Sequence, residues 1–297
     1  MITAVVQLVL VWLTSSTALR ADTIHNFSDA LTSVPLWIAF VVGRRAADRT
    51  HTYGFGRAED LAGLFVVGMI AFSAVLVGWE SLQRLFEPAE VSHLGLLAAA
   101  GIVGFVGNEL VAIYRIRVGT EIGSQALVAD GLHARTDGLT SIAVVVAAAG
   151  VWLGFPLADP LIGLVITVAI LWILRDAARA VFRRLMDAVD PELVDEIERV
   201  AGEVEGVKAV ETVRVRWVGH RLRASVSLVV DCSQSVAEGH HIAEHVRHSL
   251  FHEVGRLDTI VVHVDPCDCG ESDAHAHTRD HDVTLPPRRE GDAAAEV

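Results

Sequence analysis

The sequence is poor in cysteine, in charged residues and in basic residues, and each shortage excludes a class of protein. Its 297 residues contain three cysteines, too few for a disulfide scaffold, which indicates a reducing compartment or metal chemistry. Only 21% of the residues are charged while 52% are hydrophobic, which excludes a disordered chain and favours a membrane protein. Basic residues number 24 against 37 acidic ones, so the net charge is −13 and a nucleic-acid partner is excluded.

The charge is distributed unevenly along the chain. Residues 1–186 hold 14 acidic and 13 basic side chains, whereas residues 187–297 hold 23 and 11. The second half also contains all three cysteines and ten of the 14 histidines. We therefore predict a transmembrane domain over 1–186, a water-soluble domain over 187–267 and a disordered acidic tail with His and Cys residues over 268–297.

Long apolar runs in the first half predict six membrane-spanning helices. A helix needs roughly 20 residues to cross the hydrocarbon core. The first run lacks the basic flank and the cleavage site of a signal peptide, so we interpret it as a span. Arginines gather between spans two and three, between spans four and five and after span six, which predicts a multi-pass cell-membrane protein with both termini in the cytoplasm. The predicted spans are about 1–18, 21–43, 58–83, 91–115, 121–153 and 157–183.

The soluble half alternates between helical and extended patterns. Amphipathic helices are predicted at 191–205 and 236–254, and strands at 207–218, 221–230 and 257–264. This α-β-β-α-β order predicts a small α+β domain with helices on one face of a sheet.

The most informative feature of the membrane half is an internal repeat. Residues 18–33 and 126–141 share the pattern A-L-x-A-D-x-x-H-x-x-x-D-x-L-T-S. The His and the second Asp of the pattern are four residues apart, so they lie on one face of a helix and point the same way. Two such helices together supply two nitrogens and two oxygens, a tetrahedral set suited to Zn²⁺. The predicted metal ligands are His25, Asp29, His133 and Asp137.

The depth of these ligands supports their pairing. Asp29 and Asp137 both lie roughly 22 to 24 Å along their helices from the cytoplasmic boundary, at 1.5 Å per residue. Ionisable groups are costly within a membrane, which favours function over a role as polar contacts between helices. Asp22 and Asp130, one turn before each histidine, either orient the imidazoles or lie in a wet vestibule. Arg135 points to another helix face, where we expect it to snorkel or to pair with a carboxylate.

The repeat, the six spans and two further motifs together resemble the cation diffusion facilitators. The motifs are Tyr53-Gly-Phe-Gly-Arg-Ala-Glu59 at the start of span three and Val262-His-Val-Asp-Pro266 at the end of the last strand. The resemblance implies a homodimeric, proton-coupled exporter of divalent metal with a V-shaped membrane bundle and a cytosolic ferredoxin-like domain. It assigns the transport site to the four repeat ligands. The histidine of the first pair resembles the zinc-preferring type, and imidazole itself favours Zn²⁺ over Mn²⁺.

The same resemblance implies two further metal sites, and the sequence matches each only in part. A site in the loop after span two would use Asp48 and His51, but its third position is Phe55. A site in the cytosolic domain lacks an expected histidine, because that position is Ser227. The first span is also about ten residues shorter than is usual in the family. The matching cytosolic positions are His240, His263 and Asp265.

Histidines outside these sites form two groups that each allow two interpretations. On the helix at 236–254, four histidines form a stripe opposite apolar residues. The stripe is either a solvated face or a weak metal-binding or pH-sensing face. The tail contains a Cys-x-Cys and a His-x-His cluster. We interpret it either as a flexible solvated segment or as a weak chelator. The stripe is His241, His245, His248 and His252, and the tail cluster is Cys267, Cys269, His275, His277 and His281.

The predicted function is a secondary transporter that exports divalent cations, foremost Zn²⁺, from the cytoplasm by alternating access. Cd²⁺, Co²⁺ and Ni²⁺ share this ligand set. Metal needs a deprotonated site, so protons compete for the same side chains, which explains antiport. The expected partners are metal ions, protons, membrane lipid and a second copy of the chain. The alternatives are an intramembrane zinc enzyme, which needs an open coordination position and a general base, and a membrane-bound metal sensor.

Overall fold

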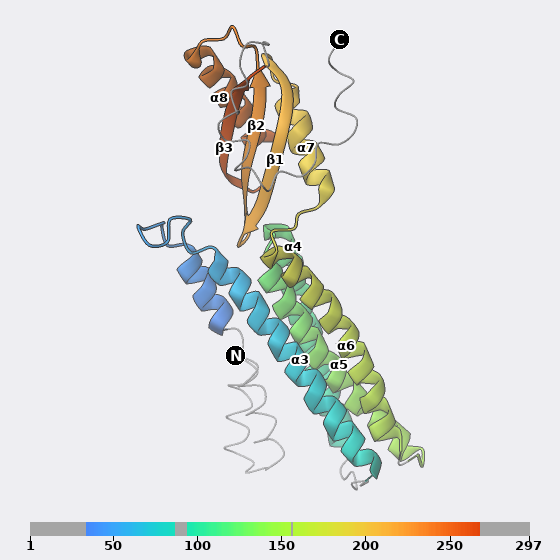
Figure 1. Cartoon of the computed structure of the whole chain (residues 1–297). Coiled ribbons are helices and arrows are strands. Elements are labelled where there is room, and N and C mark those ends of the chain that lie inside the picture. Colours follow the sequence, from blue (N-terminus) through green and yellow to red (C-terminus); the bar gives the residue numbers. More distant parts are fainter. Residues whose placement is uncertain (1–33, 87–93, 156, 268–297) are drawn as a thin grey trace. The chain divides into compact units, whose positions relative to one another are not determined.

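The computed structural model describes residues 34–86, 94–155 and 157–267, which fall into two compact units (Figure 1). The first unit contains the long helices together with the hairpin ends of two strands and the first residues of a third. The second contains the rest of a small α+β domain. The units are Met1–Val194, Arg214–Ala224 and Val254–Thr259 on one side, and Asp195–Val213, Ser225–Glu253 and Ile260–Val297 on the other.

Four long helices follow a short apolar one, Val34–Gly43. They are α3 (Arg57–Phe86), α4 (Leu94–Ile122), α5 (Gln125–Trp152) and α6 (Ala158–Leu185). Among the described residues, three segments are long and apolar enough to cross a membrane: α3, α5 and residues Pro160–Leu185 of α6. These segments and α4 coincide with predicted spans three to six, whereas the first predicted span and half of the second lie outside the described residues.

The bundle core lies where α3, α5 and α6 meet. Val66 and Ile70 of α3, Ala129 of α5 and Ile170 and Val181 of α6 are all buried in one cluster. Large apolar side chains also cover the outside of the bundle, such as Trp79 at 65% exposed and Trp172 at 68% exposed. An apolar exterior on an apolar core is the pattern of helices surrounded by lipid, because lipid tails are as apolar as the core.

Helices α4 and α5 form a hairpin whose backbones approach closely through glycine. A Cβ on Gly131 would lie 2.7 Å from Cγ1 and 2.9 Å from the backbone nitrogen of Ile116, so only glycine fits there. The turn depends on Gly123, whose φ of +75° is readily adopted by glycine. Ser124 then caps α5, because its hydroxyl accepts a hydrogen bond from the Leu127 backbone N–H at 3.2 Å.

The α+β part follows the predicted element order. It consists of α7 (Pro191–Gly202), β1 (Val207–Val218), β2 (Arg221–Val230), α8 (Val236–Glu253) and β3 (Leu257–Pro266). The sheet has the order β1-β2-β3. β1 and β2 form a hairpin, so they are antiparallel. The backbone N–H of Leu222 donates to Arg256 and that of Cys267 to Val230, so β2 and β3 are parallel and α8 is the crossover between them.

Alternation decides which face of the sheet is buried. Along β2, Leu222, Val226 and Leu228 are at most 2% exposed, and the residues between them are more accessible. Val246 and Leu250 of α8 are likewise fully buried, at one-turn spacing. The predicted amphipathic patterns therefore correspond to the observed core.

Candidate metal centre

His133 and Asp137 lie one turn apart on the same buried face of α5. His133 is 4% exposed, and its Nδ1 lies 3.9 Å from Oδ1 of Asp137. An ion bound to both at ordinary Zn–N and Zn–O lengths would hold these two atoms roughly 3.4 Å apart. A small rotation of either side chain is therefore enough to form half of a tetrahedral site.

The other half of the predicted centre, His25 and Asp29, lies outside the described residues. The hydroxyl groups around the described half bond locally to the backbone. Thr136 donates to the His133 carbonyl at 2.6 Å, and Thr140 donates to the Asp137 carbonyl at 2.8 Å. Both hydroxyls are therefore engaged with the backbone of their own helix.

Asp130 belongs to an ion pair between helices. It is 1% exposed, and its Oδ2 lies 2.8 Å from the Arg115 guanidinium of α4. Its side chain is thus enclosed by the packed helices. The carboxylate one turn before His133 therefore helps to hold α5 against α4.

Of the two environments expected for Arg135, the structure shows the pair with a carboxylate. Its Nε and Nη2 donate to the two oxygens of Glu109 on α4, at 3.2 and 2.8 Å. The arrangement is the two-pronged geometry that guanidinium and carboxylate favour. The positive charge next to the candidate site is thus neutralised by α4.

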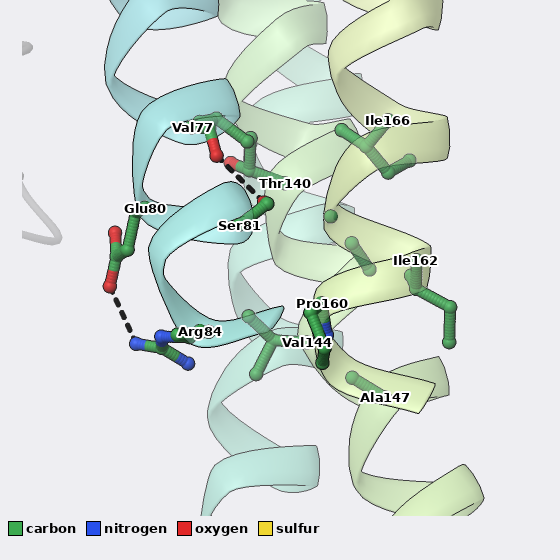
Figure 2. Close-up of a pocket in the computed structure, with 12 residues that line it drawn as sticks. Val77, Glu80, Ser81, Arg84, Thr140, Val144, Ala147, Pro160, Ile162 and Ile166 are labelled. Atoms are coloured by element: carbon green, nitrogen blue, oxygen red, sulfur yellow. Dashed lines mark hydrogen bonds and ion pairs between the residues drawn. The ribbon is translucent and has the colours of Figure 1, made fainter. Parts of the chain in front are cut away.

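A hollow lies between α3, α5 and α6, beyond Thr140 along α5 (Figure 2). It has a volume of about 210 Å³ and mostly apolar walls, including Val77, Val144 and Ile166. The one carboxylate in its lining, Glu80, accepts a hydrogen bond from Arg84 at 2.5 Å. These walls offer few atoms that could bind a metal ion, so we do not interpret the hollow as a second metal site.

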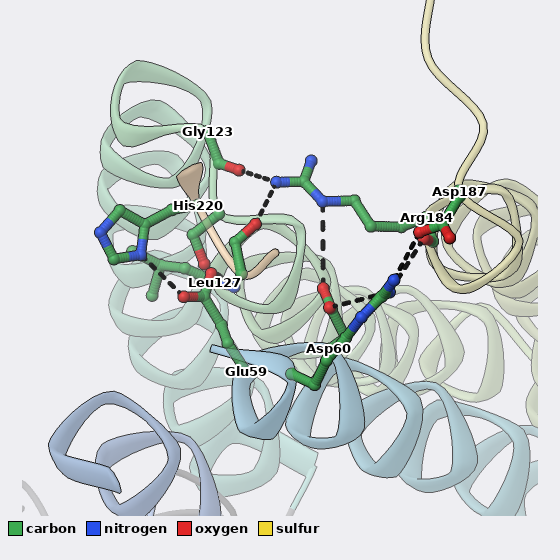
Figure 3. A network of polar contacts seen from close by, with 10 residues as sticks. Glu59, Asp60, Gly123, Leu127, Arg184, Asp187 and His220 are labelled. Carbon is green, nitrogen blue, oxygen red and sulfur yellow. Dashed lines mark hydrogen bonds and ion pairs between the residues drawn. The ribbon is translucent and has the colours of Figure 1, made fainter. Parts of the chain in front are cut away.

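A buried arginine lies at the end of the bundle where the chain leaves α6 (Figure 3). Arg184 is 6% exposed and donates to the carbonyl oxygens of Gly123 at 2.5 Å and Gly219 at 2.6 Å. Its Nε also lies 3.9 Å from Oδ1 of Asp60. This one side chain joins α6, the α4–α5 turn and the β1–β2 hairpin, all within the first unit.

A second contact in the same network joins the hairpin to the start of α3. Nδ1 of His220 lies 2.9 Å from Oε2 of Glu59, a residue that is 4% exposed (Figure 3). Arg57 also pairs with Asp187, just after α6. Arg57 and Glu59 belong to the motif at the start of α3, but their partners cannot be inferred from the sequence because the contacts depend on how the elements pack.

The predicted loop site is brought together only in part. Asp48 accepts a hydrogen bond from the backbone of Thr50 at 2.8 Å, and His51 Nδ1 lies 3.3 Å from Asp48 Oδ1. The pKa of Asp48 lies below its usual value, mainly because its carboxylate accepts a hydrogen bond from the His51 backbone N–H. The Phe55 ring packs against the His51 ring with centroids 4.3 Å apart. An aromatic ring therefore lies where the third ligand was expected.

In the α+β domain, His263 and Asp265 lie together and His240 is exposed. Nε2 of His263 is 3.0 Å from Oδ1 of Asp265, which is 8% exposed. The histidine stripe of α8 faces outward as predicted, and the rings of His248 and His252 meet edge to face at 4.4 Å.

A different set of three residues has the spacing of metal ligands within the described ranges. Candidate ligand atoms of Asp231, Cys232 and Cys267 all lie within 4.8 Å of one another. Cys232 is also disulfide-bonded, whereas Cys267 is not. A count of cysteines cannot reveal a single bond of this kind, because pairing depends on which residues the fold brings together.

Two family domains account for nearly all of the described chain. The cation efflux transmembrane domain matches residues 1–186, and the cytoplasmic domain of cation efflux proteins matches residues 189–267. The chain belongs to the cation diffusion facilitator family. It is a membrane transporter that exports metal cations and is not an enzyme, so the alternative of an intramembrane zinc hydrolase is wrong.

Curated relatives cover most of the chain. A "Probable cation efflux system protein" of Mycobacterium tuberculosis is 57% identical over 271 residues, which are 91% of this chain and 82% of that protein. The cation-efflux pump FieF of Serratia proteamaculans is 29% identical, over 86% of this chain and 85% of its own length. The manganese efflux system protein MneP of Bacillus subtilis is 26% identical, over 84% and 87%.

Proposed function

We propose that this protein exports Zn²⁺ from the cytoplasm in exchange for protons, using His25, Asp29, His133 and Asp137 as the transport site. The observation that carries the proposal is the pair of a buried His133 and a 13% exposed Asp137 on one face of α5. The same sequence pattern occurs a second time around His25 and Asp29. A duplicated pair of one imidazole and one carboxylate is a complete tetrahedral ligand set.

The ligand types favour zinc over manganese. Imidazole nitrogen suits Zn²⁺, and also Co²⁺, Ni²⁺ and Cd²⁺, whereas Mn²⁺ favours carboxylate and carbonyl oxygen. One relative is named for manganese efflux, so the family includes exporters with other preferences. The two histidines of the repeat are the feature that favours Zn²⁺ in this chain.

Proton exchange follows from the chemistry of the ligands. An imidazole binds metal only when it is neutral, and a carboxylate only when it is ionised. A proton arriving from the outer side therefore displaces the ion, and loss of that proton to the cytoplasm prepares the site for the next ion. Alternating access of the buried site to the two sides couples the two flows.

The proposed assembly is a homodimer of six-span protomers with both termini in the cytoplasm. Arginine-rich loops on one side of the predicted spans support this orientation. The match of residues 189–267 to the cytoplasmic domain of the family supports a domain boundary just after the bundle. Asp48 with His51, and His240 with His263 and Asp265, are proposed as weaker accessory sites on the cytoplasmic side.

The test is transport by purified protein in proteoliposomes. We expect uptake of Zn²⁺ and Cd²⁺, faster with an acidic vesicle interior, and little uptake of Mn²⁺ or Fe²⁺. Asp137→Asn should abolish it. Asp176→Asn is the matched control, because its carboxylate is 58% exposed on the same bundle. Uptake that ignores the pH gradient would contradict antiport, and full uptake by Asp137→Asn would contradict the site.

A further inference from the structure

Side chains from all three strands meet at one end of the α+β sheet. Lys208 lies at the start of β1, Asp231 and Cys232 follow the end of β2, and Cys267 follows the end of β3. β2 and β3 are parallel and joined by α8, so both strands finish at the same end of the sheet. Binding sites are common at the carboxyl ends of parallel strands, where loops bring different residues together.

The ligand atoms at this end of the sheet are close enough for one ion. Those of Asp231, Cys232 and Cys267 lie within 4.8 Å of one another. Two sulfurs bound to one tetrahedral Zn²⁺ at ordinary length lie roughly 3.8 Å apart. A movement of about 1 Å therefore completes the geometry, and the exposed position leaves room for water as a further ligand.

A cation already lies among these groups. Nζ of Lys208, the single lysine of the chain, is 2.7 Å from Oδ2 of Asp231 and 3.5 Å from Sγ of Cys267. These contacts raise the pKa of Lys208, and the hydrogen bond to Asp231 is the largest cause. The Cys267 sulfur also accepts from the backbone N–H of Cys232 at 3.4 Å. The cluster thus surrounds positive charge with a carboxylate and a sulfur.

We propose that Asp231, Cys232 and Cys267 form a metal site for a thiophilic divalent ion of the Zn²⁺ and Cd²⁺ class, available once the disulfide at Cys232 is reduced. Thiolate sulfur selects ions of this kind over Mg²⁺ or Mn²⁺. The site lies within the second unit and shares no residue with the proposed transport site. It therefore does not depend on which ion is exported.

Reduction and metal binding are two separate steps. A phosphine cleaves the disulfide by taking oxygen from water, and the two protons of that water give the thiol of Cys232 and the thiol of its disulfide partner, whereas Cys267 is not disulfide-bonded. The Cys232 and Cys267 thiols then lose their protons as the ion binds. Lys208 is displaced from Asp231 and Cys267, because the ion takes over both contacts.

The test is a Cd²⁺ titration of the full-length protein in detergent, read by the ultraviolet absorption of sulfur-to-cadmium charge transfer. The proposed transport ligands contain no sulfur, so the signal is blind to that site and to whether the transport proposal holds. Phosphine-reduced protein should develop the band at one Cd²⁺ per chain, and unreduced protein should develop much less. Reductive methylation with a ¹³C label should give a Lys208 signal that shifts over the same titration.

Variants distinguish this site from the tail. Cys232→Ser and Cys267→Ser should each lose most of the band, and Asp231→Asn should weaken Cd²⁺ binding. Cys269→Ser and Asp258→Asn are the matched controls and should retain it, with circular dichroism confirming that each variant is folded. A band that survives Cys232→Ser but is lost in Cys269→Ser would assign binding to the Cys-x-Cys of the tail and overturn the proposal. So would the absence of a band in reduced wild-type protein.

Discussion

The guanidinium of Arg135 holds both carboxylate oxygens of Glu109, at 2.8 and 3.2 Å. The pair joins α5 to α4 two residues after His133. Arg135→Met leaves a carboxylate without its partner in a largely apolar bundle, and we expect a loss of roughly 1 to 3 kcal/mol in the free energy of unfolding. Arg135→Met combined with Glu109→Gln should recover most of it. Unfolding in mixed micelles measures both, and a double variant no better than the single one would mean that the pair is not a stabilising unit.

Gly131 is a position where added volume should be poorly tolerated. A Cβ there would lie 2.7 Å from Ile116, so Gly131→Ala forces α4 and α5 apart and should cost roughly 1 to 3 kcal/mol. Transport should fall as well, because His133 lies two residues further along α5. The control is Gly107→Ala on α4, where the new methyl group meets nothing within 4 Å. Thermal unfolding should separate the two variants, and equal melting temperatures would contradict the close approach.

Arg184 should be far more sensitive to substitution than the arginine beside it. Arg184→Ala removes the donor to the Gly123 and Gly219 carbonyls and leaves Arg57 as the remaining cation beside the buried Asp60, so we expect a loss of about 3 to 5 kcal/mol. Arg183→Ala removes a side chain that is 48% exposed and should change stability by less than about 1 kcal/mol. Chemical unfolding of both variants measures the difference, which should vanish if Arg184 is merely a surface charge.

We expect the stability of the folded protein to depend on pH through Glu238, at the start of α8. The backbone N–H of Ser235 donates to its carboxylate at 2.7 Å, and this hydrogen bond is the main reason that the pKa of Glu238 is lowered. A lowered folded-state pKa stabilises the protein above the unfolded value of 4.5, and this stabilisation is lost as the pH falls through the folded-state pKa. Glu238→Gln keeps an acceptor but cannot ionise. Melting temperatures from pH 3 to 7 should show wild type above the variant near neutrality and the two converging in acid; a gap that is constant with pH would argue against the carboxylate.

Periodicity and alternation were sufficient to predict the elements of the α+β domain. β1 and β2 have the predicted bounds, and β3 extends two residues further. These patterns are local, so a single sequence contains them. The partner of Arg135 was predicted only as a carboxylate, because the choice of Glu109 depends on how α4 packs on α5.

Contacts between distant elements could not be predicted in the same way. Arg184 is one of several arginines after the last span, and nothing in its neighbours indicates that it is buried. Asp231 and Cys267 are 36 residues apart, and they meet because β2 and β3 are parallel. Of the proposed transport site, the described residues contain the half formed by His133 and Asp137.

The contacts between α4 and α5 also limit how the transporter can move. The close approach at Gly131, the pair of Arg115 with Asp130 and the pair of Arg135 with Glu109 fasten residues 109–116 of α4 to residues 130–135 of α5. His133 and Asp137 are therefore carried on a rigid two-helix body rather than on a single mobile helix. In the proposed transport cycle, exposing them first to one side of the membrane and then to the other would require that body to tilt as a whole against its neighbours, so that the proposed ligands on α5 would move together.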